Sequence, residues 1–201
     1  MSLRYLALGD SYTIGEGVAP DGRWPEQLAR RLRDAGVPLQ TPRILATTGW
    51  TTDELSAAMD ASRLEPPYDL VSLLIGVNNQ YRGRTADDYR AEFRRLLARA
   101  TGLSGGRPGR VLVLSIPDWG VTPFARQENR DSTRIGAELD AYNALARDET
   151  CRHGAHWVDI TPISRQCPAL LATDGLHPSA EQYARWAEAA QNAAREALQS
   201  S

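Results

Sequence analysis

Three polar side chains in the sequence are of the types that together activate a hydroxyl group, namely Ser11, Asp174 and His177. A serine hydroxyl is a poor nucleophile at neutral pH, so it needs a base that takes its proton and a third group that orients this base. Asp174 precedes His177 by three residues in a turn that contains Gly175, a spacing that lets the carboxylate reach the near ring nitrogen. The far nitrogen would then face Ser11. This pattern predicts acyl transfer with Ser11 as nucleophile, His177 as base and Asp174 as its orienting group.

Acyl transfer also needs hydrogen-bond donors for the oxyanion that develops in the tetrahedral intermediate. The sequence offers three candidates, which are the backbone N–H of Ser11, the backbone N–H of Gly49 and the side-chain amide of Asn78. Gly49 suits this role because a glycine lets the backbone and a ligand approach each other closely. We therefore expect Ser11, Gly49 and Asn78 to form an oxyanion hole.

The elements that must position these residues follow from the hydrophobic pattern. Short apolar runs, typical of strands, cover residues 4–8, 44–46, 70–75, 111–116 and 157–160. Segments of helical character cover residues 24–35, 52–62, 85–100, 135–150 and 179–198. The last of these begins with Ser179 and Gln182, a capping-box pattern. Strands that alternate with helices predict an α/β fold, with a parallel sheet and helices on both of its faces. The stretch from Pro117 to about Ser132 is the one long segment predicted to be irregular.

Small and polar residues come directly after the predicted strands. Ser11 follows the first strand, Gly49 the second and Asn78 the third. Asp174 and His177 lie beyond the fifth strand, just ahead of the last predicted helix. Ligands of open α/β sheets bind at the carboxyl ends of the strands. The sequence therefore predicts that the candidate residues meet at one edge of the sheet.

Four short blocks of the sequence carry a resemblance to a known family. They are Gly9-Asp10-Ser11, Gly49 within residues 46–52, Gly76-Val77-Asn78 and Asp174-Gly175-Leu176-His177, in this order along the chain. In these blocks the sequence resembles the GDSL, or SGNH, hydrolases. The resemblance implies a three-layer α/β/α sandwich with a flavodoxin-like five-stranded parallel sheet. It also implies hydrolysis of carboxylic esters or thioesters, with Ser11, Asp174 and His177 as catalytic residues and Ser11, Gly49 and Asn78 as oxyanion donors.

One position departs from the pattern of this family. The third block of the family usually reads Gly-x-Asn-Asp, and the chain has Asn79 where Asp is common. Asn78, the implied oxyanion donor, is kept. The departure therefore concerns the local support of this loop, and the subfamily, rather than the mechanism.

The substrate and the pocket that would bind it stay open between alternatives. Trp50, Trp119, Val121 and Phe124 lie at or near predicted strand ends, where they either line an acyl or leaving-group pocket or pack the loops against the sheet. The first interpretation is an acylhydrolase of small or lipid-like esters, and the second is a sugar O-acetyl esterase. Alternatives from other classes are a catalytically silent binding module and a flavodoxin-like binding protein. The flavodoxin-like alternative is disfavoured because no Gly-x-Gly-x-x-Gly loop follows a predicted strand.

Composition bounds the remaining function classes. The chain has 201 residues, which favours a single domain over residues 1–201, and its net charge of −2 offers nucleic acid no broad positive field. No apolar run is as long as a membrane span, and the N-terminal apolar run is too short for a secretory signal. We therefore expect no transmembrane segment and a cytoplasmic location, unless a leader was removed. Cys151 and Cys167 cannot provide a zinc site by themselves, and a disulfide between them stays open. No metal or cofactor is expected.

Three further features are set aside. Residues 102–106 fit the Gly-x-Ser-x-Gly pattern of a nucleophile elbow, but that elbow follows a strand, whereas this segment follows a predicted helix. A metal site is disfavoured between the fourth helix and the fifth strand, because no fourth ligand is near Cys151, His153 and His156. Solvated positions are expected for three arginines, with contact to an anionic substrate as the alternative: Arg82, Arg84 and Arg126.

Overall fold

The computed structural model describes residues 2–199 and is built on a parallel five-stranded β-sheet. The strand order is β2-β1-β3-β4-β5, and every neighbouring pair is parallel. The strands are β1 (Tyr5–Gly9), β2 (Arg43–Ala46), β3 (Leu70–Leu74), β4 (Val111–Leu114) and β5 (His156–Val158). This arrangement confirms the predicted α/β fold and its five-stranded parallel sheet.

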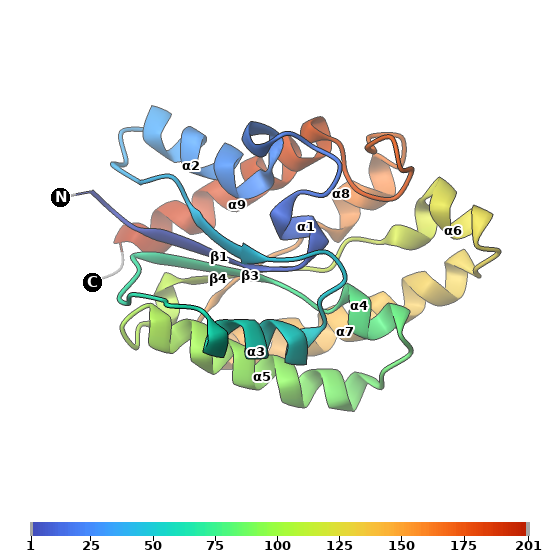
Figure 1. Ribbon diagram of the computed structural model, residues 1–201, viewed down its shortest axis with the longest axis horizontal. Helices are drawn as coiled ribbons and strands as arrows, with labels where there is room; N and C mark the ends of the chain where they lie inside the picture. Colours follow the sequence, from blue (N-terminus) through green and yellow to red (C-terminus); the bar gives the residue numbers. More distant parts are fainter. Residues whose placement is uncertain (1, 200–201) are drawn as a thin grey trace.

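Helices cover both faces of the sheet, so that the fold has three layers (Figure 1). One face carries α1 (Ser11–Ile14), α2 (Trp24–Asp34), α8 (Thr161–Gln166) and α9 (Ala180–Gln199). The opposite face carries α3 (Thr52–Ala61), α5 (Ala86–Leu103) and α7 (Ser132–His153). Shorter helices lie between these elements: α4 (Val77–Tyr81), α6 (Pro123–Gln127) and the 3₁₀ turns η1 (Pro20–Gly22), η2 (Pro108–Arg110) and η3 (Trp119–Val121).

The three central strands form the buried centre of the core. Every residue of β1, β3 and β4 is buried, because helices cover both faces of these strands. Side chains that alternate between two covered faces must all avoid water, which explains the continuous apolar runs in the sequence. The edge strands β2 and β5 are partly exposed, and their apolar runs are correspondingly shorter.

The first and last long helices pack against each other and fix the start of α9. The buried face of α2 presents Trp24, Leu28 and Leu32, while α9 buries a row of alanines that allows close approach. The side-chain amide of Gln27 donates to the carbonyl of Ala180 at 2.8 Å. This bond anchors the first turn of α9, which begins three residues after His177.

The segment predicted to be irregular, residues 117–132, is partly helical, so that prediction is wrong. It contains η3 and α6. The Thr122 side chain caps α6 by accepting a hydrogen bond from the N–H of Ala125 at 3.3 Å. The sequence pattern also missed α1, α4 and α8, because helices of four to six residues are shorter than the window in which helical periodicity can be seen.

The capping box predicted at the start of α9 forms only in part. The Ser179 hydroxyl accepts a long hydrogen bond from the N–H of Gln182, at 3.4 Å. The Gln182 amide instead donates to the carbonyl of Leu170 at 2.9 Å, and the N–H of Ser179 donates to the same carbonyl. Gln182 therefore fastens the chain that precedes the turn of Asp174 and His177 rather than its own helix.

Candidate active site

The nucleophile candidate lies at the point where the strand order reverses. After β1 the chain crosses to β2 on one side, and β3 pairs with β1 on the other. Such a switch point is where open α/β sheets bind ligands. Ser11 follows β1 and Asn78 follows β3, so these two residues lie on adjacent strand ends. The topology thus brings two distant blocks of the sequence to the same edge.

A tight turn places Ser11 at the first position of α1. The side chain of Asp10 caps this helix by accepting a hydrogen bond from the N–H of Tyr12 at 3.0 Å. Gly9 is required here, because a Cβ atom at this position would overlap the side chain of Thr13 and lie 2.5 Å from the carbonyl oxygen of Leu74. The first N–H groups of a helix have no partner inside it. The N–H of Ser11 is therefore available as a donor beside its own hydroxyl.

Asp174 and His177 form a hydrogen-bonded pair in the turn before α9. The Nδ1 atom of His177 lies 2.6 Å from Oδ2 of Asp174. The other carboxylate oxygen accepts from the N–H groups of Leu176 at 2.9 Å and His177 at 3.0 Å. The ring of Tyr12 packs edge-on against the imidazole, with 5.8 Å between the ring centroids. The imidazole is thus oriented on one side by the carboxylate and on the other by an aromatic ring.

The electrostatics of this pair favour an ionised carboxylate. Burial alone would raise the pKa of Asp174, but hydrogen bonds from the His177 ring and from the two backbone N–H groups outweigh it, so the pKa lies below its ordinary value. An ionised carboxylate can only accept hydrogen bonds, which places a proton on Nδ1 of His177. In the neutral imidazole, Nε2 is then the basic nitrogen.

The two other oxyanion candidates lie on neighbouring loops. Gly49 adopts a φ of 88°, a left-handed conformation that favours glycine. The side-chain amide of Asn78, on α4, donates to the carbonyl oxygen of Trp50 at 2.9 Å. An amide nitrogen carries two hydrogens, so this bond orients the group and leaves a second donor.

One cavity brings these residues together. Ser11, Gly49, Asn78 and His177 all line a cavity of about 220 Å³. Its remaining wall is mostly aromatic and aliphatic: Tyr12, Thr48, Val77, Tyr81, Trp119, Phe124 and Leu176. Segments that follow separate strands supply a hydroxyl and amide groups, and the turn before α9 supplies an imidazole, to one largely apolar cavity.

Two of the four residues expected in the pocket line this cavity. Trp119 is buried, its indole N–H donates to Oε1 of Gln80 at 2.9 Å, and its ring packs edge-on against Phe124. The backbone N–H of Phe124 donates to the carbonyl of Gly175 at 3.1 Å, which ties α6 to the turn of Asp174 and His177. Trp50 and Val121 are not among the lining residues.

Sequence reasoning missed part of the cavity wall. Tyr81 ends α4, and its ring packs edge-on against Trp119 at 5.5 Å between centroids. A single tyrosine in a short, unpredicted helix gives no periodic signal. The Asn78 block, three residues earlier, was the only hint that this residue lies near the site.

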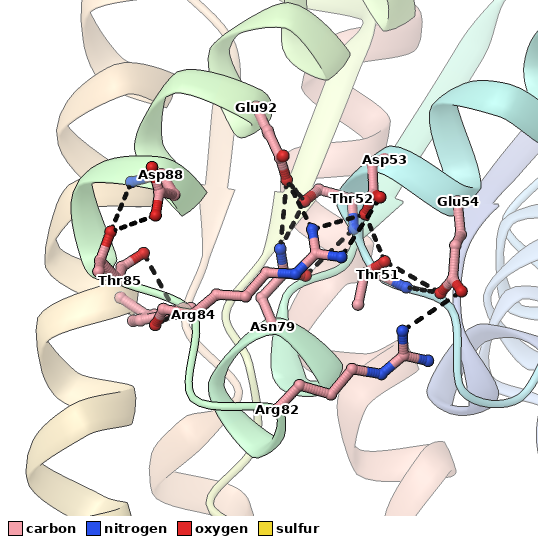
Figure 2. A network of polar contacts seen from close by, with 11 residues as sticks. Thr51, Thr52, Asp53, Glu54, Asn79, Arg82, Arg84, Thr85, Asp88 and Glu92 are labelled. Carbon is pink, nitrogen blue, oxygen red and sulfur yellow. Dashed lines mark hydrogen bonds and ion pairs between the residues drawn. The ribbon is translucent and has the colours of Figure 1, made fainter.

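The departure from the family pattern at position 79 lies in a buried polar network (Figure 2). Oδ1 of Asn79 accepts from the N–H of Thr52 at 3.1 Å, and Nδ2 donates to the Thr52 hydroxyl at 2.6 Å and to Glu92 at 3.4 Å. The Thr52 hydroxyl donates in turn to Glu92. An ionised Asp could not donate to these oxygens. Glu92 on α5 supplies the carboxylate of this network, and Asn79 supplies the amide N–H that donates to it.

Two of the arginines expected on solvated faces are engaged in this region. Arg84 donates to Asp53 at 2.6 Å and to Glu92 at 3.4 Å (Figure 2). Its hydrogen bond is the largest influence that lowers the pKa of Asp53 to about 2. Arg82 donates to the carbonyl oxygen of Gly49 at 2.7 Å. Arg82 and Arg126 both keep the expected exposed position, and Arg126 makes one bond to the carbonyl of Val121, whereas Arg84 is half-buried.

The features set aside in the sequence have structural partners. The hydroxyl of Ser104 donates to the carbonyl of Arg107 at 2.7 Å at the end of α5. His153 bonds through Nε2 to Thr101 at 2.9 Å. Cys151 and Cys167 are both free. Within residues 2–199, no group of three or more His, Cys, Asp and Glu side chains is arranged to hold a metal ion, and no helix is both long and apolar enough to cross a bilayer.

Comparison with known proteins decides the family. The sequence profile of the GDSL-like lipase/acylhydrolase family matches residues 7–185. The chain belongs to this family. The match spans all four sequence blocks from Gly9 to His177, which confirms the resemblance to GDSL, or SGNH, hydrolases. Among curated proteins, no match was found.

Solved structures share the fold of this GDSL family member at low sequence identity. A lipase/acylhydrolase from Enterococcus faecalis is 21% identical with a TM-score of 0.70, covering 94% of each chain. The psychrotrophic esterase EstA from Pseudoalteromonas sp. is 14% identical with a TM-score of 0.74, covering 98% of this chain and 99% of its own. The acetyl xylan esterase Axe2 from Geobacillus stearothermophilus is 19% identical with a TM-score of 0.72, covering 96% and 94%. At these identities the likeness concerns the fold.

Proposed function

We propose that the protein is a serine esterase that cleaves carboxylic ester or thioester bonds through an acyl-enzyme on Ser11, with a preference for short acyl groups. The observation that carries this proposal is the single cavity lined by Ser11, His177, Gly49 and Asn78. Membership of the GDSL-like lipase/acylhydrolase family supports an ester substrate.

In the proposed reaction, Oγ of Ser11 attacks the acyl carbon while Nε2 of His177 takes the hydroxyl proton. The ionised Asp174 accepts the hydrogen bond from Nδ1 and stabilises the imidazolium. The N–H groups of Ser11 and Gly49 and the amide of Asn78 stabilise the oxyanion. Collapse of the intermediate breaks the bond to the alcohol or thiol, which receives the proton from His177. Water then repeats both steps, releasing the acid and regenerating Ser11.

The size of the cavity favours short acyl groups. Its volume is about 220 Å³. Pockets for drug-sized ligands begin at about 300 Å³. The ring of Trp119 packs edge-on against Tyr81 on one side and against Phe124 on the other, so three aromatic rings form one continuous part of the wall.

A sugar O-acetyl esterase is the second candidate, because an acetyl group would also fit a small cavity. Axe2, an acetyl xylan esterase, shares the fold. A sugar ring, however, needs an exposed aromatic face on which to stack. Trp119 is only 2% exposed and is held by Gln80, so it offers no such face, whereas Tyr81 on the cavity wall is 41% exposed. Tyr81 therefore keeps the sugar acetate as a second candidate.

A panel of p-nitrophenyl esters, from acetate through butyrate and octanoate to dodecanoate, tests the proposal. We expect kcat/KM to be highest for acetate and butyrate and to fall by about tenfold or more at octanoate, because longer chains exceed the cavity. A peracetylated monosaccharide and a matched acetyl thioester are run beside it. Preference for the sugar acetate would favour the second candidate.

Ser11→Ala is the matched control for every substrate. We expect this variant to lose turnover and to resist a fluorophosphonate probe that labels the wild-type protein. A wild-type protein that neither turns over any ester nor reacts with the probe would be a silent binding module. Turnover that survives in Ser11→Ala would contradict the assignment of the nucleophile.

A further inference from the structure

Side chains along α4 and its C-terminal cap hydrogen-bond to the loop that carries Gly49. Three residues of this segment reach across to the loop between β2 and α3, and each hydrogen-bonds to a different part of its backbone: Asn78 to the carbonyl of Trp50, Asn79 to the N–H of Thr52, and Arg82 to the carbonyl of Gly49. Asn78 and Arg82 are four residues apart, so they project from the same side of the helix. Only the bond from Arg82 is made to Gly49 itself.

The guanidinium of Arg82 is held between two oxygens. Its Nη2 atom donates to the Gly49 carbonyl at 2.7 Å, and its Nη1 atom donates to Oε1 of Glu54 at 3.3 Å. The second oxygen of Glu54 accepts from the N–H of Thr51 at 2.8 Å (Figure 2). Arg82 and Glu54 thus brace the loop from both sides of residue 50.

Packing alone does not hold Gly49 in place. Its φ of 88° is accessible mainly to glycine, and a Cβ atom placed there would meet no described atom within 4 Å. A glycine, which has no Cβ, can rotate its peptide groups at little steric cost. Rotation would turn its N–H, the proposed oxyanion donor, away from the cavity. The bond from Arg82 to the Gly49 carbonyl opposes this rotation by holding the peptide that follows Gly49, and the bond from the N–H of Trp50 to the carbonyl of Thr47, at 3.3 Å, restrains the same peptide.

We propose that Arg82 is a positioning residue for the oxyanion hole, acting through Gly49 and braced by Glu54. The inference rests on the proposed function, because it takes the Gly49 N–H as an oxyanion donor. Arg82 does not line the cavity. Its effect is therefore expected in the transition state, where the oxyanion forms, and not in the binding of the ground-state ester.

Arg82→Met, which keeps an unbranched apolar stem and removes every donor, tests the inference. Removing an oxyanion donor outright costs about 10²–10³ in kcat, so loss of its support is expected to lower kcat by about tenfold, with KM within about twofold of the wild type. Arg82→Lys, which can still donate to the carbonyl, should recover part of kcat. Glu54→Gln should lower kcat in the same direction by a smaller factor.

Arg126→Met is the matched control. The guanidinium of Arg126 also donates a hydrogen bond to a backbone carbonyl, that of Val121, but Arg126 lies on α6 and not beside Gly49. This variant removes one positive charge near the site and is expected to leave kcat unchanged. Thermal unfolding midpoints of all variants, measured in parallel, separate a kinetic effect from loss of folded protein.

The Ser11→Ala variant separates failure of the positioning role of Arg82 from failure of the proposed function. If Ser11→Ala abolishes turnover while folded Arg82→Met keeps the wild-type kcat, the positioning role is wrong and the esterase assignment stands. A change confined to KM in Arg82→Met would mark a contact with bound substrate and overturn the inference. Turnover that persists in Ser11→Ala would contradict the proposed function itself.

Discussion

Asp10 and Asp174 both stand beside a group of the proposed reaction, yet their carboxyl groups have opposite surroundings. Asp10, next to Ser11, is fully buried, and its Oδ2 has no hydrogen-bond partner among the described residues. Burial raises its pKa from 3.8 to about 7, and the N–H of Tyr12 offsets only part of this effect. Asp174 keeps 40% of its side chain exposed, and both of its oxygens accept hydrogen bonds. Its pKa lies below the ordinary value.

The comparison shows that solvation and hydrogen-bond donors, rather than nearness to the chemistry, set the charge of a carboxyl group. The turn of residues 174–177 folds its own N–H groups onto Asp174, which keeps the ionised form stable while the imidazole is protonated. The turn after β1 gives the Asp10 side chain one hydrogen bond from another residue, the N–H of Tyr12. We therefore expect Asp174 to matter for catalysis and Asp10 to matter for stability.

The largest expected effect is that of Asp174→Asn. The amide has no negative charge to stabilise the imidazolium and allows the wrong tautomer of His177, so kcat/KM should fall by about 10³–10⁴-fold. Steady-state kinetics on p-nitrophenyl acetate measures this change. A fall of only a few-fold would show that the carboxylate does not orient the base.

Asp10→Asn is expected to change stability in a pH-dependent way. The folded-state pKa of about 7 lies above the unfolded value, so the wild-type protein loses stability as pH rises from about 4 to 7 and carries the full penalty above it. The variant does not titrate. Its free energy of unfolding relative to the wild type should therefore rise by up to about 4 kcal/mol between pH 4 and pH 8. Urea unfolding at the two pH values gives the difference.

Two outcomes would break the comparison between the carboxylates. A stability difference that does not change with pH would mean that Asp10 titrates near its ordinary pKa. A loss of activity in Asp10→Asn as large as that in Asp174→Asn would mean that both carboxyl groups take part in the reaction.

The smallest expected effect is that of Thr13→Val, in the helix that follows Asp10. The hydroxyl of Thr13, in the helix α1 that Asp10 caps, is buried and has no hydrogen-bond partner within residues 2–199. Thr13→Val replaces this hydroxyl by a methyl group of similar shape, which removes the cost of an unsatisfied polar atom. We expect the free energy of unfolding to rise by about 1 kcal/mol. A lower stability in chemical denaturation would show that the hydroxyl has a partner, such as a buried water.

The parts of the fold that the sequence predicted are those with a repeated physical signal. The strands β1, β3 and β4 are covered on both faces, so each shows as an unbroken apolar run. The long helices α2, α5 and α9 show apolar positions at helical spacing. The short helix α6 depends instead on a single cap from Thr122 and on its link to Gly175, and neither leaves a periodic pattern in the sequence.

The candidate site divides in the same way. Ser11, Gly49, Asn78, Asp174 and His177 were visible because each stands at a strand end or in a turn of recognisable chemistry. The supports of the site were not visible, because Arg82 and Glu92 act across distances in sequence that only the fold closes. Asn79 was flagged as a departure from the family, but its partner Glu92, on α5, carries no motif.

The backbone hydrogen bond between Phe124 and Gly175 determines which sequence changes around the cavity the fold can accept. It joins the wall of the cavity to the turn of Asp174 and His177 through main-chain atoms alone, so it does not depend on which side chain occupies position 124. Replacing Phe124 by a smaller residue should enlarge the cavity while this tether stays intact. An insertion or deletion in α6 would shift the tether and the turn of Asp174 and His177 together. Libraries that aim at longer acyl chains should therefore vary side chains at constant loop length.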